Sequence, residues 1–239
     1  KKPTYPLVMG VLVCCLFSSV AILASVIRNG AIDYWLGGWK PPWGIAYKID
    51  HLNAIMLVLI SLLSLLTAIH AKKSIERELP ERTTPFWSLF LLLITGLLGI
   101  CITGDLFNLF VVLEVASVSG YALIAMGEKK ALYASFRYIV IGTIGASFYL
   151  LGVGYLYMAT GSLNMVNLAQ LLPERYHSKV VLVGFAFIFL GLSIKMALFP
   201  MHVWLPDAYA YAPSAVSAVV APLMTKVMAY VMIRVMFTV

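Results

Sequence analysis

The sequence predicts an all-α fold, a polytopic bundle of about seven transmembrane helices in which one helix is broken. Two observations predict this fold class: 62% of the 239 residues are hydrophobic, and only 11% are charged. A soluble domain usually has about a quarter of its residues charged. The long apolar stretches are also apolar on every side, which is typical of helices that contact lipid or other helices all round.

The net charge of +7 does not indicate a nucleic-acid partner, because the basic residues occupy short loops between apolar runs, where they usually set membrane topology. The adjacent Cys14 and Cys15 lie inside an apolar run, so the three cysteines predict neither a disulfide framework nor a metal site. The sequence contains no phosphate loop, HExxH, paired CxxC or GxSxG motif. We therefore expect no cofactor and no metal in this chain.

The first span covers about residues 7–27, after two lysines. Its length and the lack of a small-residue cleavage site predict a retained helix rather than a signal peptide. The loop at 29–50 is rich in Gly, Trp and Pro, which predicts an interfacial hairpin. A second span follows at about 51–71, and the charged run at 72–82 predicts a solvated loop.

The apolar stretch at 86–126 is about twice as long as a bilayer requires, so it must contain a turn. Its polar cluster is Thr103-Gly104-Asp105 with Asn108. The turn therefore belongs there, which predicts a third span at 86–102 and a fourth at 106–126.

The fifth span covers about residues 133–159, and its small residues predict close approach of neighbouring helices; they are Gly142, Gly145, Ala146, Gly152 and Gly154. The polar connection at 160–179 predicts a short surface helix at 164–172. The sixth span begins near residue 180, and Pro200 and Pro206 predict its break. The last span, at about 214–236, follows Pro213 and contains Pro222.

Alternation of the spans assigns the loops to two sides of the membrane. One side carries eight basic residues: Lys1, Lys2, Lys72, Lys73, Arg77, Arg82, Lys129 and Lys130. The other side carries six: Arg28, Lys40, Lys48, Arg175, Lys179 and Arg234. The positive-inside rule therefore favours the first side as cytoplasmic.

Glu114 lies eight residues into the fourth span, with no basic residue within one helical turn. A carboxylate at that depth costs several kcal/mol unless it is paired, hydrated or protonated. Ser117 and Tyr121 share its helix face and are candidates to hydrogen-bond with it. Ionisable residues inside a membrane are functional by default; the alternative is a neutral glutamate bonded to a neighbouring helix.

Two lysines lie inside the later spans. Lys195 precedes the expected break at Pro200 by five residues, where freed carbonyls can hold water or an ion. Lys226 lies near the middle of the last span, with Tyr230 one turn further on the same face. For both lysines the alternative is snorkelling to the membrane surface. With Glu114 they predict a proton relay, while a ligand pocket or a purely structural ion pair stays open.

Three further titratable residues are candidates for support or relay. Asp105 and Asp207 lie at helix ends, and Asp105 is expected to cap the fourth span. His202 lies near the broken span, where a histidine either shuttles protons or is structural.

Two motifs resemble a known family. TGDLFNLFVVLEVASVSGYALIA at Thr103–Ala125 resembles the glutamate-bearing helix of the antiporter-like subunits of respiratory complex I, Mrp-type cation/proton antiporters and membrane-bound hydrogenases. GLSIKMALFPMHVWLPDAYAYAPSAVSAVVAPLMTKVMAY at Gly191–Tyr230 resembles the lysine-bearing broken helix of that family and the helix after it. The GDLFNLF wording looks closest to the D-type subunit of Mrp antiporters, a type that includes archaeal hydrogenase and sulfur-reducing relatives.

The resemblance implies a fold of two inverted five-helix repeats, each with one broken helix. Residues 1–85 would then be N-terminal transmembrane helices, and residues 86–239 would be the first repeat, a proton half-channel. Glu114 matches the glutamate of that half-channel, Lys195 its partner lysine and Lys226 the next relay lysine. Members of the family have about twice as many spans, so a fragment and a split relative completed by another subunit both remain open.

The sequence and the resemblance together predict a proton-translocating, or cation/proton-translocating, subunit of a multisubunit respiratory or hydrogenase-type complex. The expected location is the plasma membrane of a prokaryote, with an archaeon as one candidate. The expected partners are other membrane subunits, the lipid bilayer, H⁺ and, as an alternative ion, Na⁺. No catalytic redox site is visible, so an enzymatic role is left undecided. A non-transporting structural subunit, a quinone-linked redox subunit and a cation channel are the alternatives; a channel would be expected to carry rings of carboxylates.

Overall fold

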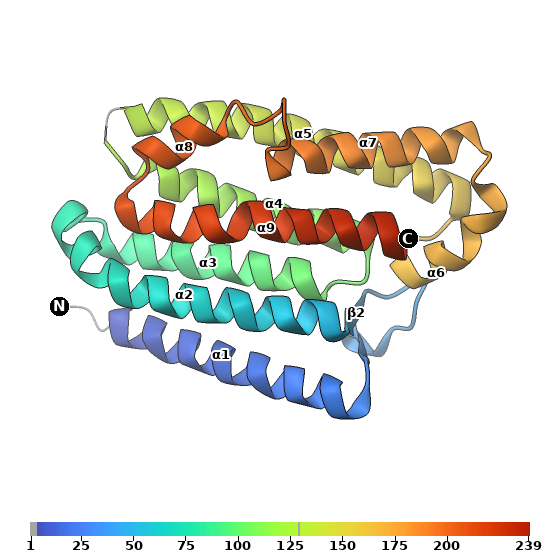
Figure 1. Ribbon diagram of the computed structural model, residues 1–239, viewed down its shortest axis with the longest axis horizontal. Coiled ribbons are helices and arrows are strands. Elements are labelled where there is room, and N and C mark those ends of the chain that lie inside the picture. Colours follow the sequence, from blue (N-terminus) through green and yellow to red (C-terminus); the bar gives the residue numbers. More distant parts are fainter. Residues whose placement is uncertain (1–3, 129) are drawn as a thin grey trace.

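The computed structural model describes residues 4–128 and 130–239, and these form a bundle of roughly parallel helices (Figure 1). Seven of the described helices are long and apolar enough to cross a membrane. The spanning helices are α1 (Thr4–Asn29), α2 (His51–Glu78), α3 (Thr83–Ile102), α4 (Leu106–Ala125), α5 (Lys130–Thr160), α7 (Lys179–Met196) and α9 (Ser214–Thr238). The shorter helices are α6 (Met165–Leu171) and α8 (Leu205–Tyr211), with 3-10 turns η1 (Leu36–Gly38) and η2 (Pro173–Arg175). The predicted helical transmembrane bundle is confirmed.

A short β-hairpin makes the fold nearly rather than entirely helical. Strands β1 (Ile32–Trp35) and β2 (Ala46–Ile49) pair antiparallel, as expected for β-branched and aromatic residues around a turn. The hairpin is joined to the connection between α3 and α4, where the Gly104 N–H donates to the Ala46 carbonyl at 2.9 Å. The predicted interfacial loop is therefore a hairpin that packs on one end of the bundle.

Helix α2 is longer than the sequence suggested, because it continues to Glu78. The prediction of a solvated loop over the whole charged run at 72–82 is therefore wrong for residues 72–78. Lys, Arg and Glu are good helix formers, and the end of α2 is held by a tertiary contact. The Glu78 carboxylate accepts hydrogen bonds from Ser214 Oγ at 2.6 Å and from the Ser214 N–H at 3.3 Å, at the start of α9.

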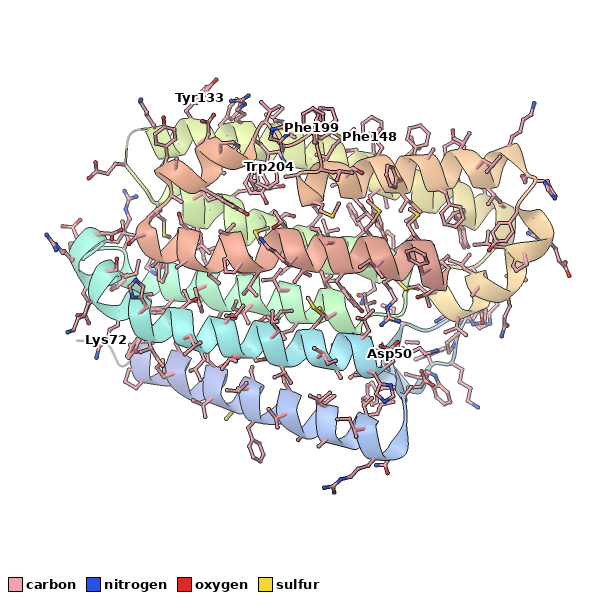
Figure 2. The ribbon with its side chains drawn as sticks, in the orientation of Figure 1. Asp50, Lys72, Tyr133, Phe148, Phe199 and Trp204 are labelled. Atoms are coloured by element: carbon pink, nitrogen blue, oxygen red, sulfur yellow. The ribbon has the colours of Figure 1, made fainter. Side chains whose placement is uncertain are left out.

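The two predicted sets of loops lie at opposite ends of the bundle. Figure 2 shows Lys72 at one end and Asp50, next to the hairpin, at the other. Lys1, Lys2 and Lys129 of the first set lie outside the described residues.

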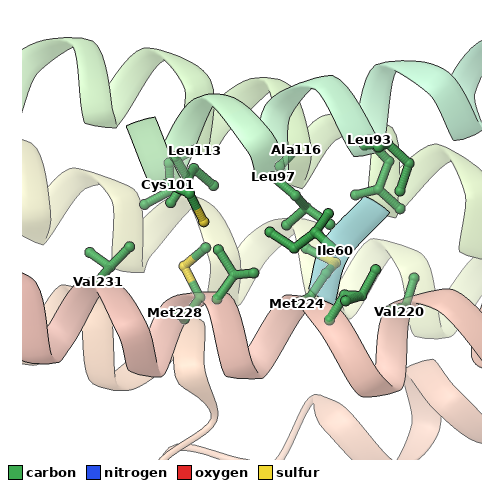
Figure 3. Close-up of a cluster of buried hydrophobic side chains, with 14 of the residues drawn as sticks. Ile60, Leu93, Leu97, Cys101, Leu113, Ala116, Val220, Met224, Met228 and Val231 are labelled. Atoms are coloured by element: carbon green, nitrogen blue, oxygen red, sulfur yellow. The ribbon is translucent and has the colours of Figure 1, made fainter. Parts of the chain in front are cut away.

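The buried core lies where α2, α3, α4 and α9 meet. Figure 3 shows the side chains from these helices, which include Ile60, Leu97, Leu113 and Met224. By contrast, only 17% of the spanning window of α1 is buried. Helix α1 therefore presents most of its apolar surface to lipid or to a partner.

Helices α5 and α7 pack through glycines. A Cβ added at Gly152 would lie 2.5 Å from the Gly184 carbonyl oxygen, and one at Gly191 would lie 2.5 Å from the Gly145 oxygen. The predicted close approach is therefore confirmed at Gly145 and Gly152. At Gly154 it is wrong, because a Cβ there meets nothing within 4 Å.

Gly152→Ala tests this contact. The added methyl group must push the α7 backbone away, and overpacking of this kind costs about 1–3 kcal/mol. We expect a lower thermal unfolding midpoint in detergent. Gly154→Ala is the matched control on the same helix and should unfold at or above the wild-type temperature, since alanine favours helix. An equal loss in both variants would contradict the packing role.

Candidate functional site

The centre of the site is the Lys195 ammonium, near the C-terminal end of α7. Its Nζ donates to Glu114 Oε1 at 2.8 Å, to Ser117 Oγ at 2.8 Å and to the Tyr121 hydroxyl at 3.4 Å. The side chain of Lys195 is 3% exposed, and that of Glu114 is 25% exposed. The predicted face of α4 is therefore turned toward the lysine of the broken span.

The hydroxyls of this face are bonded to the lysine rather than to the carboxylate that the sequence suggested. Ser117 Oγ donates to the Leu113 carbonyl at 2.8 Å, which leaves its lone pairs free to accept from Lys195. Residues 114, 117 and 121 follow the helical spacing that places side chains on one face. The ammonium thus has three oxygen partners at a depth where an unpaired charge would be costly.

Tyr121 reaches Lys195 because α5 has a glycine opposite it. A Cβ at Gly142 would overlap the Tyr121 hydroxyl, so the predicted close approach at Gly142 is also confirmed. The Tyr121 ring meets Tyr138 edge-on at 4.4 Å between centroids. Tyr138 in turn stacks on Trp204 at 4.0 Å. These rings form an aromatic wall beside the lysine.

The break in the sixth span covers residues 197–204. Ala197 adopts the left-handed conformation at φ 58°, and the Leu198 N–H donates to the Ser193 carbonyl at 2.9 Å, which ends α7. Pro200 follows and has no N–H to continue the helix. Pro206 lies in the first turn of α8, where proline is well tolerated. It is the second residue of α8 and lies at the start of this helix, so the prediction that Pro206 interrupts a helix is wrong.

Three buried polar atoms in the described part of the chain have no hydrogen-bond partner: Ser193 Oγ, His202 Nδ1 and Tyr209 OH. All three belong to the broken span or its continuation. Buried polar groups in proteins are nearly always hydrogen-bonded, to ordered water where the protein supplies no partner. These three groups on the broken span and its continuation are therefore candidates to bind ordered water. A relay role for His202 stays a prediction.

Both predicted helix-end aspartates have partners. Asp105 caps α4 as expected, because its carboxylate accepts from the Asn108 N–H at 2.7 Å. Burial raises the pKa of this carboxyl. Asp207 pairs with Arg137 of α5 at 2.8 Å. Arg137 was missed, and the available signal was an unexplained basic residue in the apolar fifth span.

Lys226 lies apart from this cluster. Its side chain is exposed, and Nζ donates to the Ala221 carbonyl at 2.9 Å. Within residues 4–128 and 130–239 no hydrogen bond joins it to Lys195 or Glu114. Tyr230 is not its partner either, because the Tyr230 hydroxyl is buried and donates to the Cys101 carbonyl at 3.1 Å.

A second ion pair fixes the hairpin end of α9. Arg234 donates to both carboxylate oxygens of Asp50, at 2.6 and 2.9 Å, and to the Tyr230 hydroxyl at 3.2 Å. Asp50 also caps α2 by accepting from the Leu52 and Asn53 N–H groups. The hydrogen bond from Arg234 lowers the pKa of Asp50. The sequence interpretation missed this pair, having treated Arg234 only as a topological charge.

Among the described residues, no group of three or more His, Cys, Asp and Glu side chains is arranged to hold a metal ion.

Residues 103–239 match the family model described as NADH:quinone oxidoreductase/Mrp antiporter, transmembrane. The chain is 49% identical over 219 residues to the N-type subunit of the NADH-quinone oxidoreductase of Desulforudis audaxviator, covering 92% of this chain and 44% of the relative. It is 33% identical over 215 residues to the D-type subunit of the Na(+)/H(+) antiporter of Bacillus subtilis, covering 90% and 43%. The chain thus spans less than half the length of these curated relatives.

Solved structures agree with the sequence matches. A chain of the membrane-bound sulfane sulfur reductase, an archaeal respiratory membrane complex, matches with a TM-score of 0.93 and 37% identity, over 100% of this chain and 48% of that one. A chain of the Mrp complex from Dietzia sp. matches with a TM-score of 0.87 and 30% identity, over 97% and 43%.

Asp50→Asn tests the hairpin-end ion pair. Asparagine keeps the helix cap but removes the charge, so thermal stability near pH 7 should fall by about 1–3 kcal/mol. Because the folded pKa of Asp50 is depressed, its contribution is present above the ordinary value of 3.8 and is lost as pH falls below it. Wild type should lose its advantage over the variant across that range. Asp33→Asn, exposed on the same hairpin, is the control and should change little.

Gly142→Ala tests how Tyr121 is positioned. The new methyl group occupies the place of the Tyr121 hydroxyl, so the ring must move away from Lys195. We expect ion translocation by the assembled complex to fall at least as far as in Tyr121→Phe, which removes the hydroxyl without crowding. If Gly142→Ala is as active as wild type while Tyr121→Phe is impaired, the glycine does not position the tyrosine.

Proposed function

Because the chain belongs to the NADH:quinone oxidoreductase/Mrp antiporter transmembrane family, we propose that it is a proton-translocating, or cation/proton-translocating, part of a multisubunit membrane complex. Relatives named as subunits of NADH-quinone oxidoreductase and of Na(+)/H(+) antiporters support this class of function. In this proposal, residues 86–239 form a half-channel, and other membrane subunits are the partners. The resemblance of the fold to chains of three multisubunit membrane complexes supports such an assembly.

The observation that carries the proposal is the position of the Lys195 ammonium. It is buried, bound by Glu114, Ser117 and Tyr121, and followed at once by the helix break. A buried ion pair contributes little to stability compared with apolar packing. Its cost is therefore better explained by a role in moving charge than by anchoring.

Glu114 and Lys195 act as a switchable pair in this mechanism. While the pair is closed, each charge favours the ionised form of the other. When the carboxylate and the ammonium separate, the ammonium loses its counter-ion in apolar surroundings and gives up its proton. Water held near Ser193, His202 and Tyr209 is the first acceptor, and Lys226 is the next relay group. When the pair re-forms, Lys195 takes up a new proton.

H⁺ fits this site better than Na⁺. The oxygens of Glu114, Ser117 and Tyr121, which would have to coordinate a sodium ion, are already bonded to the Lys195 ammonium. A sodium ion would have to displace a covalently attached cation of the same charge. The ion that passes Lys195 is therefore a proton, and any coupled Na⁺ passes elsewhere in the complex.

Glu114→Gln and Lys195→Ala test the function. In proteoliposomes containing the assembled complex, each variant should lower proton uptake by roughly a hundredfold, the usual contribution of a positioned proton-transfer group. Glu128→Gln and Lys73→Ala make the same chemical changes at exposed sites and should pump normally. The amount of assembled complex is measured by immunoblot.

If Glu114→Gln and Lys195→Ala both assemble normally and take up protons at the wild-type rate, the two residues have only a structural role. If the ion that passes Lys195 is Na⁺, the proposal that this ion is a proton is wrong. This second result is recognised if Lys195→Ala abolishes ²²Na⁺ movement but leaves proton movement intact.

A further inference from the structure

Helix α8 is short and buries little of its surface in the rest of the bundle. It has seven residues, of which only Ala208 is fully buried. It lies between the break at 197–204 and the connection to α9 (Figure 1). Because α8 buries little apolar area, the hydrophobic effect stabilises its position only slightly. Polar contacts must therefore contribute much of the free energy that holds α8 against the bundle.

The strongest such contact is the ion pair between Asp207, in the first turn of α8, and Arg137 of α5. Arg137 Nη1 lies 2.8 Å from Asp207 Oδ2, and both side chains are about one-third exposed, at 34% and 35%. The proton relay described above does not use either residue. A fully buried pair would be expensive to open, whereas this pair lies where it can break and re-form.

The residue next to Arg137 connects the same place to Lys195. Tyr138 stacks on Trp204, the last residue of the break, with centroids 4.0 Å apart and ring planes 3° from parallel. Trp204 Nε1 donates to the Ile194 carbonyl at 3.0 Å, and Ile194 precedes Lys195. Figure 2 shows Trp204 at the junction between α7 and α8.

A second set of contacts leads from Tyr138 to the same ammonium. The Tyr138 ring meets Tyr121 edge-on at 4.4 Å, and the Tyr121 hydroxyl accepts from Lys195. Arg137 and Tyr138 are consecutive on α5, so one segment of that helix holds α8, the break and the surroundings of Lys195 together. A displacement of α8 would pull Trp204 from Tyr138 and from the end of α7.

We infer that Arg137 and Asp207 are positioning residues, a latch that holds α8 and thereby keeps Lys195 within reach of Glu114. With the latch closed, Trp204 stays between Tyr138 and the Ile194 carbonyl, and Lys195 is bound on α4. With the latch open, α8 and the break move and Lys195 can leave Glu114. This inference rests on the proposed function for its consequence in transport, but the mechanical coupling is independent of it.

The first experiment measures the coupling in the assembled complex without transport. Arg137→Met removes the charge and keeps a long side chain; Arg137→Lys keeps the charge. Hydrogen–deuterium exchange of peptides covering 197–212 should be about tenfold faster in Arg137→Met, from the loss of a charge-assisted hydrogen bond. Acetylation of Lys195 by acetic anhydride, read by mass spectrometry, should rise in parallel. Arg137→Lys should stay near wild type.

The exchange of partners gives the second test. Arg137→Asp combined with Asp207→Arg should restore slow exchange and low acetylation, whereas each single reversal should not. Arg28→Met, at the exposed end of α1, is the control for removing an arginine. Unchanged exchange in Arg137→Met, or failure of the double reversal to recover, would overturn the inference.

Proton uptake separates this inference from the proposed function. The latch predicts that Arg137→Met lowers uptake and that the double reversal recovers it. If Glu114→Gln pumps at the wild-type rate, the proposed function fails, while the exchange and acetylation results still decide whether the pair positions α8 and Lys195. If Glu114→Gln is inactive and Arg137→Met changes neither exchange nor uptake, only the latch fails.

Discussion

The structure depends on keeping one ammonium charged inside a lipid-facing bundle. Lys195 satisfies this constraint with three oxygens from a single face of α4, which fixes the rotation of that helix about its axis. The same requirement restricts the residue that α5 can carry opposite Tyr121. Tyr121 reaches the ammonium only because Gly142 of α5 has no Cβ. The end of α7 is held in place as well, because Trp204 Nε1 donates a hydrogen bond to the Ile194 carbonyl in the last turn of that helix. The identity of several residues is thus determined by one buried charge.

Apolar runs of spanning length and their polar interruptions predicted the helices and the turn between α3 and α4, because hydropathy is a local property of the sequence. The pairing of Glu114 with Lys195 could also be predicted from the sequence, because two unlike charges in mid-membrane require each other. The pairs of Arg137 with Asp207 and Arg234 with Asp50 were missed, because Asp207 and Asp50 lie at helix starts, where a carboxylate needs no partner from another helix. Helical spacing also suggested Tyr230 as a neighbour of Lys226, but spacing along one helix says nothing about which adjacent helix each side chain meets.

The two ends of the bundle are fastened by different chemistry. At the hairpin end, Asp50 both caps α2 and binds Arg234. At the opposite end, Glu78 binds the first N–H and hydroxyl of α9, where a carboxylate also interacts favourably with the helix dipole. Helices α2 and α9 are therefore tied at both ends, and the exposed Lys226 lies on a helix that is fixed in position.

The glycine contacts between α5 and α7 have a consequence for where motion is allowed. Backbone meets backbone at Gly145, Gly152, Gly184 and Gly191, so at these four positions the two helices are too close for either to slide past the other easily. Close-packed interfaces of this kind deform little. The α-carbon of Lys195 is consequently a fixed pivot, and a change of partner must come from rotation about its own side-chain bonds and from the chain beyond Ala197. The long flexible stem of a lysine suits such a pivot, since it lets the charge travel while the helix that carries it stands still.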